Sequence, residues 1–308
     1  MAAPSITVQD KWITVSNNNE LFTKTWKPAG KPVAHVILIH GFGEHIARYD
    51  HVATLFAQNG IQVYGFDQRG WGQTGKKSKQ YGNNQGYNTA LSDINEAVHA
   101  VHESGVPLFL IGHSMGGGLA LNYLAKKEQF DGVKLVRGAI ASAPLITLTL
   151  PISPLRYYPL MLVSRILPSW VIQAGLDPKG ISHDEQEVQK YVDDPLIHDY
   201  ATLSTSKLLR FQRLAFAKHF AKVRGFLDAG YSLLTEGKAI ETPVLFSHGD
   251  ADPLNSYHST AKVYEIASST DKSLRTFPGL YHELHNETRD ERNKVLESYL
   301  EWIKARIP

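Results

Sequence analysis

The sequence predicts an α/β protein whose mostly parallel sheet is covered by helices on both faces. Short apolar runs rich in β-branched residues alternate with helical patterns along most of the 308 residues. This alternation is typical of parallel sheets built from βαβ units. It stops between residues 145 and 237 and then resumes. We therefore expect a core made of residues 1–144 and 238–308, with a cap or lid insertion at 145–237 over the edge of the sheet where ligands bind.

The individual elements follow from the pattern in chain order. A hairpin comes first, because two alternating segments, 5–16 and 20–28, flank the turn-forming Asn17-Asn18-Asn19. Later strands are expected at residues 34–40, 61–67, 107–112, 136–144, 243–250 and 273–279. Helical spacing of apolar residues predicts helices at 48–60, 89–104, 114–128, 255–269 and 290–307, and a further helical stretch at 204–234 inside the insertion.

Composition and charge exclude several classes of protein. The formal net charge is only +2, and no long Lys/Arg run is present, so we expect no nucleic-acid partner. The absence of cysteine excludes a disulfide scaffold and a Cys-based zinc site. The first ten residues lack the basic and apolar regions of a secretory signal, and we expect a cytoplasmic protein. The apolar stretch 144–170 is broken by four prolines and two arginines, so it is not a membrane-spanning helix.

Residues Gly112 to Gly116 lie between a predicted strand and a predicted helix. They match the G-x-S-x-G pattern of a nucleophile elbow, a sharp strand-to-helix turn that exposes the serine. The alternatives are a Gly-rich turn with an N-capping serine and a phosphate-binding loop. The P-loop interpretation fails, since no Gly-Lys-Ser/Thr follows. We predict that Ser114 is a catalytic nucleophile.

A serine nucleophile needs a base, usually histidine, and a carboxylate that orients the base. In proteins with this elbow the chain order is serine, acid, histidine. Downstream of Ser114, a strand end offers Asp250 and Asp252, and the next loop offers His282 and His285. Both loops therefore carry residues of the required type in the required order.

Asp252 is the preferred acid, because Pro253 holds it extended beyond the strand. Asp250 leaves the strand directly and is expected to brace the turn. The alternative role for Asp252 is the N-cap of the next helix, with Pro253 at the first helical position. His282 is the preferred base, because it follows a strand and its Pro-Gly turn, while His285 and His248 are competitors.

The segment His282-Glu283-Leu284-His285 superficially resembles a zinc signature. The zincin pattern places two residues between the glutamate and the second histidine, so that both histidines lie one helical turn apart. Only one residue intervenes here. We therefore predict no metal site, and no cofactor is expected.

The loop after the strand 34–40 begins with His40-Gly41-Phe42-Gly43. In proteins with a nucleophile elbow, this loop gives one backbone N–H of the oxyanion hole and the residue after the nucleophile gives the other. This assigns Phe42 and Met115 through their main-chain nitrogens. The alternative is a Gly-rich loop that only turns off the strand, with both side chains in the core or the pocket wall.

Taken together, five segments resemble the monoacylglycerol lipase (monoglyceride lipase) family of α/β-hydrolases, and its fungal members most. These segments are HGFGEHIARY, FDQRGWGQT, GHSMGG, SHGDADPL and YHELH. The resemblance implies an α/β-hydrolase fold with a cap, and cleavage of monoacylglycerols to glycerol and free fatty acid through an acyl-enzyme. It also implies a triad of Ser114, Asp252 and His282.

The family lines its glycerol site with polar groups, and the matching positions here are Glu44, Arg48, His113 and Tyr191. Two alternatives remain: Glu44 and Arg48 as a surface ion pair, and His113 as a packed supporting residue. The apolar residues 145–167 suit an acyl tunnel and a lid that meets a membrane or lipid droplet. Competing functions are another carboxylesterase or lysophospholipase of the same fold, and a non-catalytic lipid-binding relative.

Overall fold

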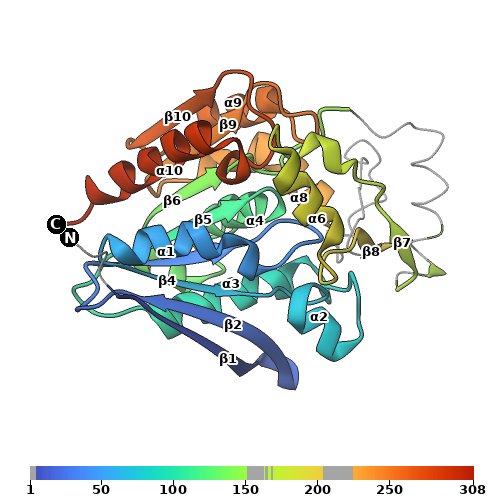
Figure 1. The fold of residues 1–308 in the computed structure, drawn as a ribbon, viewed down its shortest axis with the longest axis horizontal. Helices are drawn as coiled ribbons and strands as arrows, with labels where there is room; N and C mark the ends of the chain where they lie inside the picture. The colour runs from blue at the N-terminus through green and yellow to red at the C-terminus, as the bar shows by residue number, and fades with distance from the viewer. Residues whose placement is uncertain (1–4, 151–162, 164–165, 168, 204–224) are drawn as a thin grey trace.

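The computed structural model describes residues 5–150, 163, 166–167, 169–203 and 225–308. Its centre is an eight-stranded sheet in the order β1-β2-β4-β3-β5-β6-β9-β10 (Figure 1). These strands are β1 (Thr7–Val15), β2 (Asn19–Lys27), β3 (Ala34–Ile39), β4 (Ile61–Phe66), β5 (Leu108–His113), β6 (Val136–Ser142), β9 (Val244–Gly249) and β10 (Lys272–Phe277). Every strand predicted from the pattern is present, with ends shifted by a few residues at most.

The directions of the strands confirm a mostly parallel sheet. Six neighbouring strands run parallel to one another: β4, β3, β5, β6, β9 and β10. Strands β1 and β2 form an antiparallel hairpin, and β2 joins the sheet by pairing antiparallel with β4. The hairpin turns through Ser16–Asn18, where Asn17 and Asn18 adopt positive φ angles of 64° and 56°. Asparagine tolerates this left-handed conformation better than most residues, which explains the Asn-rich turn.

Helices cover both faces of the sheet, as expected for parallel strands (Figure 1). They are α1 (Asp50–Gln58), α2 (Gly72–Ser78), α3 (Tyr87–Val101), α4 (Met115–Leu124), α8 (Phe226–Glu236), α9 (Tyr257–Ile266) and α10 (Arg289–Lys304). Buried residues of α1 and α10 form one apolar cluster with the sheet. Buried residues of α3, α4, α8 and α9 form the other cluster. Two such clusters make a three-layer α/β/α core.

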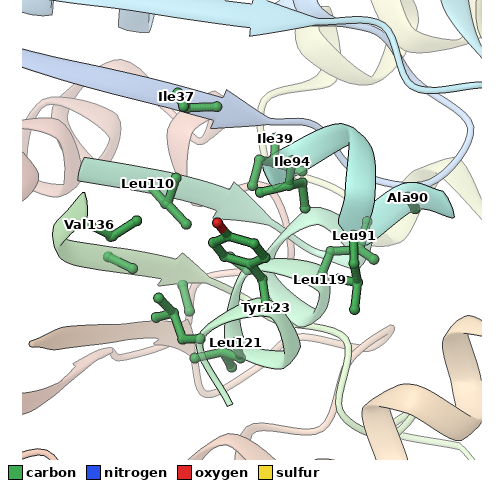
Figure 2. Packing of buried hydrophobic residues seen from close by; sticks show 14 of the residues in the cluster. Ile37, Ile39, Ala90, Leu91, Ile94, Leu110, Leu119, Leu121, Tyr123 and Val136 are labelled. Carbon is green, nitrogen blue, oxygen red and sulfur yellow. The ribbon is translucent and has the colours of Figure 1, made fainter. Parts of the chain in front are cut away.

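Helix α4 is the central helix of its layer, and all ten of its residues are buried. Figure 2 shows Tyr123 and Leu119 of α4 among Leu91 of α3 and Leu110 of β5. Burial of each large side chain contributes about 1.5–3 kcal/mol. Close packing also explains a glycine next to the elbow, because a Cβ on Gly118 would lie 2.6 Å from the Leu145 carbonyl oxygen.

Some elements were not predicted from the sequence. Helix α2 was missed because its sequence, GQTGKKS, has two glycines and no apolar periodicity. Within the insertion, the short strands β7 (Val171–Gln173) and β8 (Tyr200–Thr202) pair antiparallel, and α6 (Glu185–Asp193) precedes β8. These elements lie together at one end of the sheet (Figure 1). Of the predicted helical stretch 204–234, residues 204–224 lie outside the described residues, and the remainder forms part of α8.

The insertion contacts the loops that follow β3, β5 and β9. The Leu145 N–H donates to the Ser114 carbonyl at 2.8 Å, and the Thr149 N–H donates to the Leu254 carbonyl at 2.9 Å. Further along, the His198 N–H donates to the Gly43 carbonyl at 3.1 Å. Over the described ranges, no helix is long and apolar enough to span a membrane.

Candidate active site

Ser114 lies at the junction of β5 and α4 in a strained backbone conformation, with φ 53° and ψ −119°. Non-glycine residues rarely adopt such angles, and they persist where the surroundings hold them. A Cβ on Gly116 would collide with the Ile39 carbonyl oxygen, and one on Gly112 would collide with the Gly116 carbonyl. The Ser114 N–H donates to the Ser142 carbonyl at 2.9 Å, which anchors the turn to β6. The turn therefore has the geometry of a nucleophile elbow.

Asp252 lies in the loop after β9, and its carboxylate accepts four hydrogen bonds. Oδ1 accepts from the backbone N–H groups of Leu254 at 2.8 Å and Asn255 at 3.0 Å. Oδ2 accepts from His282 Nδ1 at 2.7 Å and from His248 Nε2 at 3.0 Å. Burial alone would raise the pKa of Asp252, but the two histidines outweigh burial and hold the pKa well below its usual range. Asp252 is therefore an ionised, fixed acceptor.

The alternative role of Asp252 as a helix N-cap is wrong. Helix α9 begins at Tyr257, and Ser256 caps it by accepting the Ser259 N–H. The interpretation of Asp250 as a turn brace agrees with its contact, since Asp250 Oδ1 accepts the Gly279 N–H at 2.6 Å. The two neighbouring aspartates thus have different partners. The Asp250 carboxylate holds the loop at Gly279, and the Asp252 carboxylate binds the side chains of His248 and His282.

His282 follows β10, and its Nδ1 must donate to Asp252, because an ionised carboxylate only accepts. In the neutral imidazole this leaves Nε2 free to accept a proton. The His282 ring lies 4.8 Å, centroid to centroid, from that of His113, the residue before Ser114. Burial would lower the pKa of His282, but Asp252, with help from Glu283 and Glu44, raises it above its ordinary value.

No hydrogen bond joins His282 to Ser114 within the part of the chain that the structure describes. The Ser114 hydroxyl oxygen instead lies 3.5 Å from Asn255 Nδ2, the edge of hydrogen-bonding distance. Catalytic hydrogen bonds are often long in unliganded enzymes and shorten when substrate binds.

The two competing histidines occupy different surroundings. His285 is buried and stacks on Tyr49 with ring centroids 4.6 Å apart. Burial, together with neighbouring His113 and His51, lowers the pKa of His285 far below its ordinary value. His248 is fully buried in β9. Its Nε2 lies 3.0 Å from Asp252 Oδ2, and its Nδ1 lies 2.8 Å from Thr260 Oγ1. Within the described residues, His285 makes no hydrogen bond to Asp252. His248 does bond Asp252, but from β9 rather than from the loop after β10, where His282 lies.

The two backbone N–H groups predicted for the oxyanion hole belong to different segments, the start of α4 and the loop after β3. Met115 is the first residue of α4, where helix geometry leaves N–H groups without intrahelical partners. Phe42 lies in the loop after β3, and its ring packs against Trp71 at 5.6 Å. Within the described segments, neither N–H donates a hydrogen bond, so both are available to an anion.

Glu44 and Arg48 form an ion pair, but their interpretation as a surface pair is wrong, because both are buried. Glu44 is 2% exposed, and the Arg48 side chain is 7% exposed. Arg48 Nη1 donates to Glu44 Oε2 at 2.7 Å, and the other Glu44 oxygen accepts the Gly41 N–H at 2.6 Å. The Tyr49 hydroxyl donates to that same oxygen at 2.6 Å. The pair therefore braces the loop that carries Phe42.

The other predicted substrate residues lie next to this pair. Tyr191, on α6, is buried, and the Arg48 guanidinium carbon lies 4.9 Å from its ring centroid. His113 is buried, and burial, then the charge of His282, lowers its pKa to about 3. Across the described residues, His113 Nδ1 has no hydrogen-bond partner. The structure thus brings all the predicted site residues to one region around Ser114 and the loop 40–49.

Several contacting residues were not predicted from the sequence. Glu283 is 3% exposed, and its two oxygens accept from Arg48 Nη1 at 2.6 Å and Nη2 at 2.8 Å. Asn255 and Thr260 contact Ser114 and His248 respectively. In the sequence, only the position of Glu283 next to His282 indicates that Glu283 belongs to the site. Among the described residues, no group of three or more His, Cys, Asp or Glu side chains could hold a metal ion.

The sheet, the strained serine and the Asp252–His282 pair are those of an α/β-hydrolase of the serine hydrolase class. A family model described as serine aminopeptidase, S33, matches residues 30–289. An uncharacterized abhydrolase domain-containing protein from Dictyostelium discoideum is 33% identical over 96% of this chain, which spans only 29% of that protein.

Two further comparisons are with monoglyceride lipases of Saccharomyces cerevisiae. The curated sequence is 30% identical, covering 87% of this chain and 83% of its own. A solved structure of a soluble variant with a substrate analog superimposes with a TM-score of 0.78 at 25% identity, covering 100% of this chain and 97% of that chain. The chain belongs to the monoglyceride lipase family of α/β-hydrolases and is a serine hydrolase.

Proposed function

We propose that this protein hydrolyses monoacylglycerols to glycerol and free fatty acid through a Ser114–His282–Asp252 triad. The observation that carries this proposal is the 2.7 Å bond from His282 Nδ1 to Asp252 Oδ2, made beside a serine held at a positive φ angle. The relatives named monoglyceride lipases support the choice of substrate. Residues 145–237 would serve as the cap over this site.

In the first half of the reaction, the Ser114 hydroxyl oxygen attacks the ester carbonyl carbon while His282 Nε2 takes the hydroxyl proton. Asp252 stabilises the imidazolium that forms. The tetrahedral intermediate then collapses, His282 returns the proton to the glycerol oxygen, and glycerol leaves. In the second half, water attacks the acyl carbon while His282 Nε2 takes its proton. The bond from Ser114 Oγ to the acyl carbon then breaks, His282 returns the proton to Ser114 Oγ, and the fatty acid leaves.

The N–H groups of Phe42 and Met115 would donate to the oxyanion of the tetrahedral intermediate. Removal of one such donor typically costs about 10²–10³ in kcat. We assign the glycerol head group to the polar region formed by Glu44, Arg48, His113 and Tyr191. The buried Nδ1 of His113, which has no partner among the described residues, supports this assignment, since a buried polar atom without a partner is costly until a ligand contacts it.

We also propose that the cap contacts membrane or lipid-droplet surfaces, where monoacylglycerols partition. Large apolar side chains are exposed on its described part, and we call this set the cap surface: Leu150, Ile166, Leu167 and Trp170. Leu150 is 77% exposed and Ile166 is 74% exposed. Such exposure of neighbouring apolar side chains is typical of surfaces that meet lipid or another protein.

A substrate panel tests the proposed activity. The purified protein is assayed with mono-, di- and triacylglycerols, lysophospholipids and an aminopeptidase substrate, with Ser114→Ala as control. We expect fastest release of fatty acid from monoacylglycerol and none by Ser114→Ala. Preference for lysophospholipid or for the peptide would replace the proposed substrate, and full activity of Ser114→Ala would refute the mechanism.

A further inference from the structure

We propose that Glu283, the residue after the predicted base, is a positioning residue that ties the base loop to the oxyanion loop through Arg48 and supplies negative charge to His282. This inference rests on the proposed function, because it assigns Glu283 a role in the same ester hydrolysis. The established family membership does not assign it, and the pattern of residues in the sequence did not single it out.

The geometry links the two loops by a continuous chain of short hydrogen bonds. Glu283 binds the Arg48 guanidinium with both oxygens, at 2.6 and 2.8 Å. Arg48 Nη1 also donates to Glu44 at 2.7 Å, and Glu44 accepts the Gly41 N–H at 2.6 Å. Gly41 precedes Phe42, whose N–H is assigned to the oxyanion hole. A displacement of Glu283 is thereby transmitted to both the base and the oxyanion donor.

Two further contacts fix Glu283 itself. Asn286 Nδ2 donates to Glu283 Oε2 at 2.7 Å, and the Glu283 N–H donates to the Ile181 carbonyl of the cap at 2.7 Å. Bidentate pairing of Arg with a carboxylate is geometrically specific, and removal of one partner of a buried pair leaves the other charge uncompensated. Glu283 is therefore held in one position between the base, the cap and Arg48.

The charge of this cluster acts on the base. Two carboxylates, Glu44 and Glu283, surround one guanidinium, so the cluster is net negative while all three groups are ionised. Burial would raise the pKa of Glu283, but Arg48 outweighs burial and lowers it to about 2, which keeps Glu283 ionised at neutral pH. A net negative cluster stabilises the imidazolium form of His282, the form that the transition state requires.

The substitution Glu283→Gln removes no charge from the other ionisable groups that face His282. Those groups are Asp252, Glu44, Arg48, His113 and His285. His113 and His285 have strongly lowered pKa values and stay neutral near pH 7. The acid limb of the activity profile therefore reports the loss of the Glu283 charge, and kcat at the plateau reports the change in positioning.

The test is the pH profile of kcat/KM for a p-nitrophenyl ester, with monoacylglycerol assayed in parallel. Glu283→Gln keeps the shape and removes the charge, so we expect the acid limb to move about one to two units lower, the effect of one charge roughly 6–12 Å away at an effective dielectric constant of about 20. Glu283→Asp keeps the charge but shortens the side chain. We expect it to lower kcat without moving the limb.

The matched control is Glu301→Gln, which removes one exposed carboxylate on α10 and should leave the limb in place. If Glu283→Gln does not fold, as judged by circular dichroism, Glu44→Gln removes a charge from the same cluster and should move the limb in the same direction. An unmoved or raised limb, an equal shift in Glu283→Asp, or an equal shift in Glu301→Gln would each overturn the proposal. Cleavage of the p-nitrophenyl ester but not of monoacylglycerol refutes the proposed substrate and leaves this test intact.

Discussion

His248 donates a hydrogen bond to the carboxylate oxygen of Asp252 that also binds His282. His248 Nε2 lies 3.0 Å from Asp252 Oδ2 and 3.2 Å from the Asn255 carbonyl oxygen. Both neighbours are acceptors, so Nε2 carries the hydrogen, and Nδ1 accepts from the Thr260 hydroxyl at 2.8 Å. The fully buried His248 thus fixes the orientation of Asp252 from inside the core.

We predict that His248→Leu lowers the free energy of unfolding by about 1.5–3 kcal/mol, the usual value of a hydrogen bond to a charged group. Urea denaturation at pH 7 measures this loss. The matched variant Thr260→Val removes a bond between neutral groups and should cost about 0.5–1.5 kcal/mol. Equal stability of His248→Leu and the wild type would show that the hydrogen bond from His248 to Asp252 contributes nothing to the free energy of unfolding.

A second prediction concerns the strained serine. Ser114→Gly and Ser114→Ala should both abolish ester hydrolysis, because neither has a nucleophile. The glycine variant should be the more stable of the two by about 1–3 kcal/mol, because glycine adopts φ 53° without the strain that a Cβ brings. Thermal unfolding measures the difference in stability between the glycine variant and the alanine variant, which serves as the reference. A less stable glycine variant would show that the elbow stores no strain.

The strands and the elbow could be predicted because their signals are local. Each buried strand is a short apolar run, and the elbow combines a serine with glycines at a strand-to-helix junction. Helix α2 and the strand pair β7–β8 could not, because two glycines in one and only three residues in each strand of the other give no periodicity. Tertiary contacts stabilise these short elements, and a single sequence does not show such contacts.

The residues of the site likewise fall into those that the sequence predicts and those that it does not. Chain order and the neighbouring Pro253 and Pro-Gly turn favour Asp252 and His282 after Ser114, and the structure brings these two side chains into contact. The partner of Arg48 could not be predicted, because Glu283 is 235 positions away. The family resemblance implies a head-group contact for Arg48, and the usual solvation of charged side chains favours a surface position. A buried ion pair is visible only when the loops after β3 and β10 are placed side by side.

A third prediction concerns the cap surface. Ile166→Ser combined with Trp170→Ser should reduce binding to phosphatidylcholine vesicles several-fold, because each change removes exposed apolar area available to lipid. Vesicle co-sedimentation measures the bound fraction. Val8→Ser, at an exposed apolar position on β1, is the control and should bind like the wild type. Unchanged partitioning of the double variant would contradict membrane contact through this surface.

The last prediction is that the protein loses stability steeply below pH 6.5. Burial lowers the pKa of His40 to about 4, that of His113 to about 3, and that of His285 well below its ordinary value. In the unfolded chain these histidines take up protons near pH 6.5, so unfolding binds up to three protons and becomes easier as the pH falls. Asp67 acts in the opposite direction by one proton. Burial raises its pKa to about 6, so the folded protein takes up this proton before the unfolded chain does as the pH falls.

These four groups together give a balance of about two protons and contribute a fall of about 3 kcal/mol per pH unit below pH 6. His35, His51 and His198, whose pKa values are also lowered by burial, act in the same direction and steepen the fall. Urea denaturation at pH 7, 6 and 5 measures it. His113→Asn removes one of the three buried histidines, so a folded variant should start less stable at pH 7 and lose stability less steeply. His258→Asn, at an exposed position on α9, should keep the wild-type slope. Constant stability from pH 6.5 to 5 would mean that the three imidazoles become protonated without unfolding, contrary to their burial in the core.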